Sequence, residues 1–254
     1  MRLFDTHAHY DDEAFDADRD EVLSAFDGLV IDPGCTLASS QAAVDLAARH
    51  PNVYAAVGIH PENCGDFLPE HIDALRHLAR QPKVVAIGEI GLDYYWAENP
   101  PREFQQQVFR AQLELALELD LPVIVHDREA HGDSLTIVRD YPALRGVFHC
   151  YSGSVEMARE LLTLGWYLGF DGPVTYKNAR KTVEVAEMAP LDRILIETDS
   201  PYMSPVPMRG KRNDSRNVLY IAEKLAQLKG MTTEEMAELT GVNGKRLFNI
   251  VKIL

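Results

Sequence analysis

Val84-Val-Ala-Ile-Gly88 forms a short apolar run, and Pro122-Val-Ile-Val-His126 forms a second one further along the chain. Between them, the stretch from Glu103 to Leu119 repeats apolar side chains at the spacing of one helix face. Short runs that are apolar throughout are typical of strands buried on both faces. The order of strand, helix and strand therefore predicts a parallel βαβ unit in this part of the chain.

The same alternation extends in both directions from this unit. The further predicted strands are Leu3 to Thr6, Leu29 to Asp32, Val53 to Gly58, Gly146 to His149, Trp166 to Phe170 and Arg193 to Glu197. The further predicted helices are Ser39 to Arg49, Pro69 to Arg80, Ser154 to Leu164 and Arg216 to Lys229. A doubly wound sheet usually has fewer strands, so this pattern and the length of 254 residues favour a (β/α)₈ TIM barrel. We expect residues 1–254 to form one such barrel domain.

The chain after Gly230 has a different pattern. Thr232 and Glu235 have the spacing of a capping box, and we expect two short helices around Gly241, an arrangement also found in DNA-binding helix-turn-helix motifs. Apolar residues recur on one face of this segment, namely Met236, Leu239, Val242, Leu247, Phe248 and Val251. A buried apolar face favours a C-terminal helical cap on the barrel over a DNA-reading module.

Composition limits the classes of partner. The chain has 39 acidic and 25 basic residues and a net charge of −14, which disfavours nonspecific binding of nucleic acid over the whole surface. Its 3 cysteines do not form a disulfide pattern, and reduced thiols are expected. The sequence has neither a membrane-spanning apolar run nor a secretory signal, so we expect a cytoplasmic protein without membrane contact or an obligatory protein partner.

Histidines and carboxylates follow the predicted strands, at the end of a parallel barrel where ligands bind. His7 and His9 end the first strand, and alternate residues of an extended segment share one face, so both imidazoles can bind the same cation. His-x-His also occurs on solvent-exposed surfaces, so the pair alone does not distinguish a metal site from two exposed histidines.

Further candidates follow other strands. Glu89 could bridge two cations or form a buried salt bridge. His126 and His149 could complete a second imidazole pair, or each could be a hydrogen-bonded structural residue. Asp199 could ligate a cation and accept a proton from water, or it could cap the turn at Ser200. Their occurrence together favours a metal site.

Weaker candidates could contact substrate. His60 and Asp93 each follow a strand and could bind substrate, orient water or support a metal ligand. The segment from Arg209 to Arg216, which includes Arg212, is basic in an otherwise acidic chain. A loop of this kind could hold phosphate by charge-assisted hydrogen bonds or remain solvated.

The ordered motifs together resemble the TatD family of metal-dependent deoxyribonucleases, within the wider amidohydrolase-like barrels, over essentially the whole chain. They are Asp5-Thr-His-Ala-His9, Gly58-Ile-His-Pro61, Gly88-Glu-Ile-Gly-Leu-Asp-Tyr94, Val125-His126, His149-Cys-Tyr-Ser-Gly153 and Glu197-Thr-Asp-Ser-Pro-Tyr202. The resemblance implies that His7, His9 and Asp199 hold one cation and His126 and His149 hold another, with Glu89 as the bridge. It also implies two divalent cations (Mg²⁺, Mn²⁺ or Zn²⁺), with DNA as the substrate.

The expected reaction is hydrolysis of DNA phosphodiesters, 3'-5' exonuclease-like, by two cations roughly 3.5–4 Å apart, with Asp199 and Glu89 as catalytic residues. The basic residues Arg209 and Arg212 match the family's loop after the last strand, although Asp214 stands where proline is common. Two rival functions remain. One is a metal-dependent barrel hydrolase of small phosphate esters, amides or lactones, and the other is a noncatalytic DNA-binding module made by the C-terminal helices.

Overall fold

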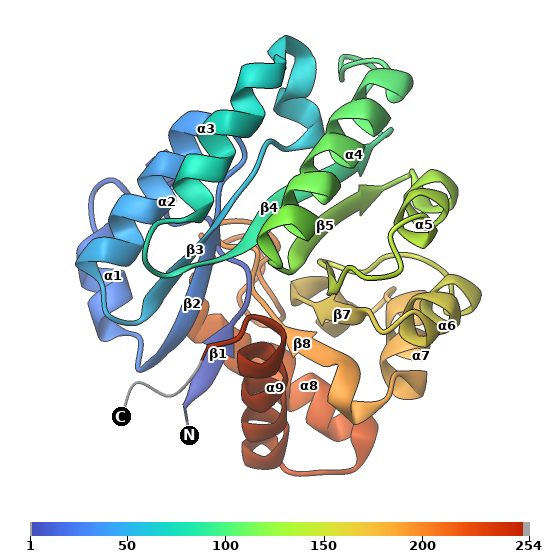
Figure 1. Cartoon of the computed structure of the whole chain (residues 1–254). Coiled ribbons are helices and arrows are strands. Elements are labelled where there is room, and N and C mark those ends of the chain that lie inside the picture. Colours follow the sequence, from blue (N-terminus) through green and yellow to red (C-terminus); the bar gives the residue numbers. More distant parts are fainter. Residues whose placement is uncertain (1, 251–254) are drawn as a thin grey trace.

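The apolar runs form parallel strands that lie around a barrel in the order of the sequence (Figure 1). The structure is a computed structural model that describes residues 2–250. The strands are β1 (Leu3–Asp5), β2 (Gly28–Pro33), β3 (Val53–Val57), β4 (Val84–Asp93), β5 (Val123–Arg128), β6 (Gly146–Phe148), β7 (Tyr167–Phe170) and β8 (Ile194–Ile196). The predicted (β/α)₈ TIM barrel is thereby confirmed.

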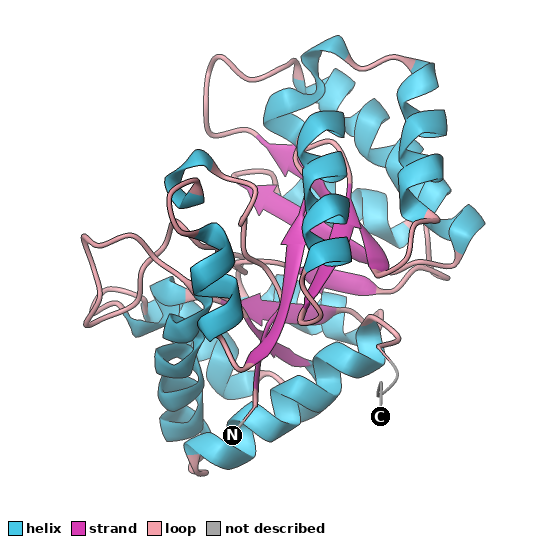
Figure 2. Cartoon of the chain, turned by 90° about the vertical axis from the view of Figure 1, so that its left-hand side faces the viewer, coloured by secondary structure: helices cyan, strands magenta, loops and turns pink. Residues whose placement is uncertain are grey.

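Helices connect the strands and cover the outside of the barrel (Figure 2). They are α1 (Arg19–Ala25), α2 (Leu37–Arg49), α3 (Pro69–Ala79), α4 (Arg102–Leu119), α5 (His131–Arg139), α6 (Val155–Thr163), α7 (Arg180–Met188), α8 (Val218–Lys229) and α9 (Thr233–Leu247). The predicted helices lie close to the bounds of α2, α3, α4, α6 and α8. In the described part of the chain, no helix is both long and apolar enough to cross a membrane.

The seam between β8 and β1 is closed by backbone hydrogen bonds beyond the strand ends. The amide of Thr6 donates to the carbonyl of Ile196 over 3.2 Å, and the amide of Asp199 donates to the carbonyl of His7 over 2.9 Å. The amide of His9 donates to the carbonyl of Ser200 over 2.7 Å. These bonds hold the segment that carries His7 and His9 directly beside Asp199, although the two segments are far apart in the sequence.

The opposite end of the barrel is closed by α9, which packs against β1 and β8 (Figure 1). Leu247, Phe248 and Ile250 join the cluster of side chains inside the barrel, and the ring of Phe248 lies 6.4 Å from that of Phe4. The helical cap is therefore present, and Met236, Leu247 and Phe248 of its apolar face are buried rather than available to read DNA. Val242, which was predicted to lie on the same face, is exposed by 47%.

Two details of the sequence prediction were wrong. The two short helices expected around Gly241 are one continuous helix, α9, because its last turn packs into the barrel and keeps the helix intact. Val251, which was assigned to the same apolar face, lies outside the described residues. Strand β4 also runs beyond the predicted end at Gly88, because Gly91, with φ of 144°, lets the backbone approach the carbonyl of His126 where a Cβ would collide.

Candidate metal centre

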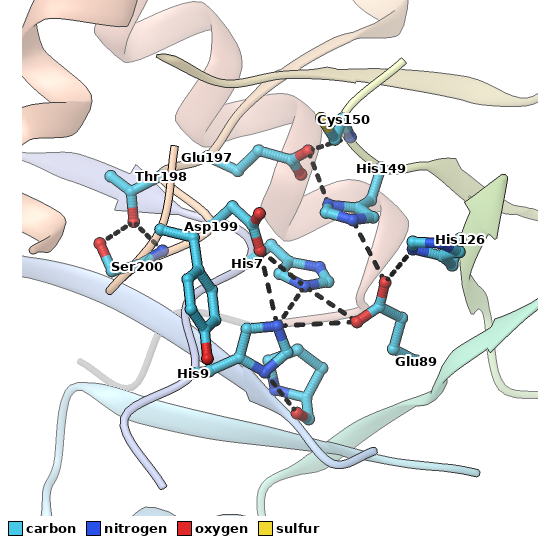
Figure 3. Close-up of polar contacts among 12 residues, drawn as sticks. His7, His9, Glu89, His126, His149, Cys150, Glu197, Thr198, Asp199 and Ser200 are labelled. Atoms are coloured by element: carbon cyan, nitrogen blue, oxygen red, sulfur yellow. Dashed lines mark hydrogen bonds and ion pairs between the residues drawn. The ribbon is translucent and has the colours of Figure 1, made fainter. Parts of the chain in front are cut away.

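The predicted ligands come together at the carboxyl end of the barrel, although they come from separate strands (Figure 3). His7 and His9 follow β1, and Asp199 follows β8. Glu89 and His126 lie within β4 and β5, and His149 directly follows β6. The side chains converge because parallel strands in a barrel end at the same rim.

One donor group contains His7, His9, Asp199 and one oxygen of Glu89. The Nε2 atoms of His7 and His9 are 3.1 Å apart. Glu89 Oε2 lies 3.4 Å from His7 Nε2 and 3.6 Å from His9 Nε2. Asp199 Oδ1 lies 3.8 Å and 3.6 Å from the same two nitrogens. Four ligands about 2.0–2.2 Å from a divalent cation are separated by comparable distances, so this donor set fits a cation.

A second donor group surrounds the other oxygen of Glu89. Glu89 Oε1 is 2.9 Å from His126 Nδ1 and 3.2 Å from His149 Nε2. His60 Nε2 lies 3.7 Å from the same oxygen, which places this weaker candidate within the cluster. Each oxygen of Glu89 thus faces a different group of imidazoles, an arrangement that suits a carboxylate between two cations.

The second nitrogens of His126 and His9 contact supporting groups. Asp93 Oδ2 is 3.0 Å from His126 Nε2, so Asp93 lies behind a candidate ligand rather than among the ligands. The carbonyl of Pro33 lies 3.2 Å from His9 Nδ1. Such contacts fix the orientation of an imidazole and increase its basicity as a metal ligand.

The buried charges of the cluster balance one another. Burial alone would raise the pKa of Glu89, but His149, His7 and His60 hold it well below its usual range. Burial would lower the pKa of His149, but Glu89 and Glu197 raise it well above its usual value. Burial lowers the pKa of His60 to about 3, so this imidazole is neutral at ordinary pH. Cations must displace protons from the charged imidazoles, and their affinity should therefore increase with pH.

Glu197 was not among the site residues predicted from the sequence. This fully buried carboxylate accepts a hydrogen bond from His149 Nδ1 over 3.2 Å and another from the amide of Cys150 over 2.6 Å. Glu197 stands two residues before Asp199 in the stretch that follows β8, a spacing that could have identified it. Its position indicates that it orients His149.

Two further carboxylates near His9 were also missed. Asp11 and Asp32 lie close enough to His9 to form a third group of candidate ligands. Burial raises the pKa of Asp32 well above its usual value, and the neighbouring carboxylate of Asp11 raises it further. Burial and the mutual repulsion of the two carboxylates therefore favour the protonated form of Asp32.

Glu89, His126, His149 and Asp199 line a cavity of about 800 Å³. Its lining includes one basic residue among the described residues, Arg128. Arg128 ends β5 two positions after His126, so both side chains lie on the same face of the strand. This spacing could have identified Arg128 from the sequence.

The basic residues expected to hold phosphate have other partners. Arg209 lies with its guanidinium 4.1 Å from the ring centre of Tyr176. Arg212 forms two hydrogen bonds to Asp18, at 2.8 and 2.6 Å. Neither side chain lines the cavity that contains the candidate ligands.

The sequence profile of the family described as "TatD related DNase" matches residues 4–249. The chain belongs to the TatD family. It is 44% identical over 254 residues to the "Uncharacterized metal-dependent hydrolase YabD" of Bacillus subtilis, a match that covers 98% of this chain and 99% of that protein. It is 34% identical over 263 residues to the "3'-5' ssDNA/RNA exonuclease TatD" of Salmonella typhimurium, covering 98% of this chain and 100% of that one.

A crystal structure of YJJV, a TatD homologue from Escherichia coli K12, has the same fold. The TM-score is 0.92 at 32% sequence identity, and the match covers 98% of this chain and 99% of that chain. The family membership and the metal-dependent hydrolases among the relatives make this TatD-family protein a metal-dependent hydrolase.

The role of Glu197 in this TatD-family hydrolase can be tested with Glu197→Gln. The amide keeps the shape of the side chain but loses the charge that His149 faces, and we expect divalent-metal affinity to fall about 10- to 100-fold. Metal titration of hydrolysis, with thermal unfolding measured in parallel, checks this expectation. Glu184→Gln, which changes an exposed glutamate on α7, is the control. Unchanged metal affinity in Glu197→Gln would show that Glu197 does not act through His149.

Proposed function

We propose that this hydrolase is a deoxyribonuclease that uses two divalent cations and removes nucleotides from the 3' end of DNA. The observation that carries the proposal is the placement of Glu89, whose two oxygens face two separate groups of imidazoles. The name of a full-length relative, "3'-5' ssDNA/RNA exonuclease TatD", supports the choice of substrate and direction.

In this proposal His7, His9 and Asp199 hold one cation, His126 and His149 hold the other, and Glu89 is shared. When bound, such cations polarise a phosphodiester and lower the pKa of water. The protein's own side chains would accept the proton of the attacking water and hold the substrate. Asp199 is ionised, because hydrogen bonding from His9 and the charge of His149 outweigh the effect of burial on its pKa. It can therefore accept the proton of the attacking water.

Two other side chains are placed to hold the substrate. His60 is a neutral imidazole at the cavity and can donate one hydrogen bond to a phosphate oxygen. Arg128 lines the cavity with an exposed guanidinium that has no carboxylate partner among the described residues. It can therefore form a charge-assisted hydrogen bond to a neighbouring phosphate.

Removal of metal should abolish the activity. We expect metal-free protein to cleave end-labelled single-stranded DNA at background rate, and to regain activity with Mg²⁺, Mn²⁺ or Zn²⁺ as two equivalents bind per chain. Elemental analysis measures the metal content, and strands labelled at the 3' or the 5' end give the direction. Release of the 3' label as mononucleotide is the expected first product.

The same assay distinguishes the alternative functions. Chelator-sensitive hydrolysis of small phosphate esters, amides or lactones without cleavage of DNA would replace the nuclease by a small-molecule hydrolase. DNA cleavage that persists after complete metal removal would contradict the proposed mechanism. Binding of one equivalent with full activity would contradict the two-cation site.

A further inference from the structure

Large apolar side chains are exposed at the mouth of the cavity, where water should disfavour them. The exposed fractions are 45% for Trp96 and 56% for Tyr202, and both side chains line the cavity that contains the candidate ligands. Met203, exposed by 38%, lines the same cavity. Exposed apolar groups gathered around a functional cavity are typical of a binding site.

Trp96 is held in place by its neighbours. The rings of Tyr95 and Trp96 are perpendicular, with centres 4.7 Å apart. The guanidinium of Arg128 lies 3.9 Å from the ring centre of Tyr95 and 5.4 Å from that of Trp96. Because Arg128 shares a strand face with His126, these contacts connect the Trp96 side of the mouth to the metal centre.

Tyr202 is held from the other side of the barrel. Its hydroxyl donates a hydrogen bond to Asp12 Oδ2 over 2.6 Å, and its amide donates to the carbonyl of Asp199 over 2.8 Å. The backbone hydrogen bond therefore holds Tyr202 next to Asp199, which is a candidate metal ligand. Strands β4 and β8, which Trp96 and Tyr202 follow, are on opposite sides of a barrel with this strand order.

The charges of the mouth indicate which part of a nucleic acid it contacts. Asp12, Glu62 and Asp127 line the cavity beside Arg128, so these acidic side chains disfavour contact of the mouth with additional phosphates. Stacking on an aromatic face does not need positive charge and accepts any base. The base must be unpaired, because a base in a duplex is already stacked on both faces and paired along one edge.

We propose that Trp96 and Tyr202 form a nucleobase-stacking subsite that receives unpaired bases next to the scissile phosphodiester. This inference rests on the proposed nuclease function and adds the residues that contact the bases of a single-stranded end. The subsite accounts for exposed aromatic rings that the hydrolytic chemistry does not use.

The test compares two oligomers with the same backbone. One is d(T)₈, and the other has the same length with abasic residues in place of the bases. With the metal-loaded enzyme we expect Trp96→Leu to raise KM for d(T)₈ roughly 10-fold, with little change in kcat and no change for the abasic oligomer. Trp96→Phe, which keeps a ring, should remain within about 3-fold of wild type. Tyr220→Leu, on α8 and outside the cavity lining, is the control.

Intrinsic fluorescence gives a readout that does not depend on turnover. The chain has 2 tryptophans, and Trp166 is buried, so the difference between wild type and Trp96→Leu isolates the emission of Trp96. Addition of d(T)₈ to the metal-loaded enzyme should quench this emission, and the abasic oligomer should not.

Each outcome decides between the two proposals. Quenching by d(T)₈ without cleavage would support the stacking subsite and contradict the nuclease function. Cleavage of d(T)₈ with no quenching and the same KM in Trp96→Leu would overturn the subsite and leave the nuclease function standing. Equal quenching by both oligomers would also overturn the subsite, because it would show contact with the backbone rather than with bases.

Discussion

Glu89→Gln is expected to lower kcat for DNA cleavage by at least about 10³-fold, the scale at which removal of a metal-bridging carboxylate removes transition-state charge stabilisation. An amide offers one acceptor oxygen and one donor group. In Glu89, Oε2 lies 3.4 Å from His7 Nε2 and Oε1 lies 2.9 Å from His126 Nδ1. Glutamine cannot place an oxygen at both of these positions. The variant should therefore bind fewer than two cations per chain.

Glu89→Gln also removes the negative charge that lies between the two groups of imidazoles. The charge of Glu89 raises the pKa of His149, so this pKa should fall in the variant. A protonated His149 would then destabilise the folded protein. The metal-free variant should lose stability mainly at acidic pH, where the imidazoles are protonated. Thermal unfolding of metal-free wild type and variant across pH measures this difference.

A matched control is available within the same cavity. Glu62 lines it with an exposed carboxylate that belongs to neither donor group, so Glu62→Gln should retain two cations and a kcat within about 3-fold of wild type. Measurement of metal content and kcat for both variants tests the bridge. Two bound cations and near-normal kcat in Glu89→Gln would exclude Glu89 as a bridging ligand.

Much of the fold could be predicted because the sequences of buried parallel strands are short apolar runs. Val84 to Gly88 and Pro122 to His126 are such runs, and the helix between them has an unambiguous apolar face. The length of β4 could not be predicted in this way. Its extension depends on contact between Gly91 and the carbonyl of His126, and the contact exists only once β5 lies alongside.

The same distinction applies to the site. His7, His9 and Asp199 stand out because each is polar and follows an apolar strand, and the closed seam brings them together. The partner of Arg212 did not stand out, because Asp18 lies on a distant part of the chain and its carboxylate holds the guanidinium away from the cavity. Positions that are set by a strand end could therefore be predicted from the sequence, whereas contacts that depend on a tertiary partner could not.

Asp199→Asn is expected to lower kcat about 10²- to 10⁴-fold, the usual effect of losing a general base, with a folded barrel. Asparagine keeps an oxygen near His7 and His9 but lacks the negative charge needed to accept a proton from water. The backbone bonds at this position, from Asp199 to His7 and from Tyr202 to Asp199, do not involve the side chain. The barrel should therefore still fold, but loss of the carboxylate beside His7 and His9 should lower the unfolding temperature of the metal-free variant.

Measurement of both kcat and metal content separates the two contributions of Asp199. A variant that binds two cations but turns over slowly would assign the loss to proton acceptance, whereas loss of one cation would assign it to ligation. Asp66→Asn, which alters an exposed carboxylate outside the cavity lining, is the control and should not change either quantity. Near-normal turnover of Asp199→Asn would refute both roles.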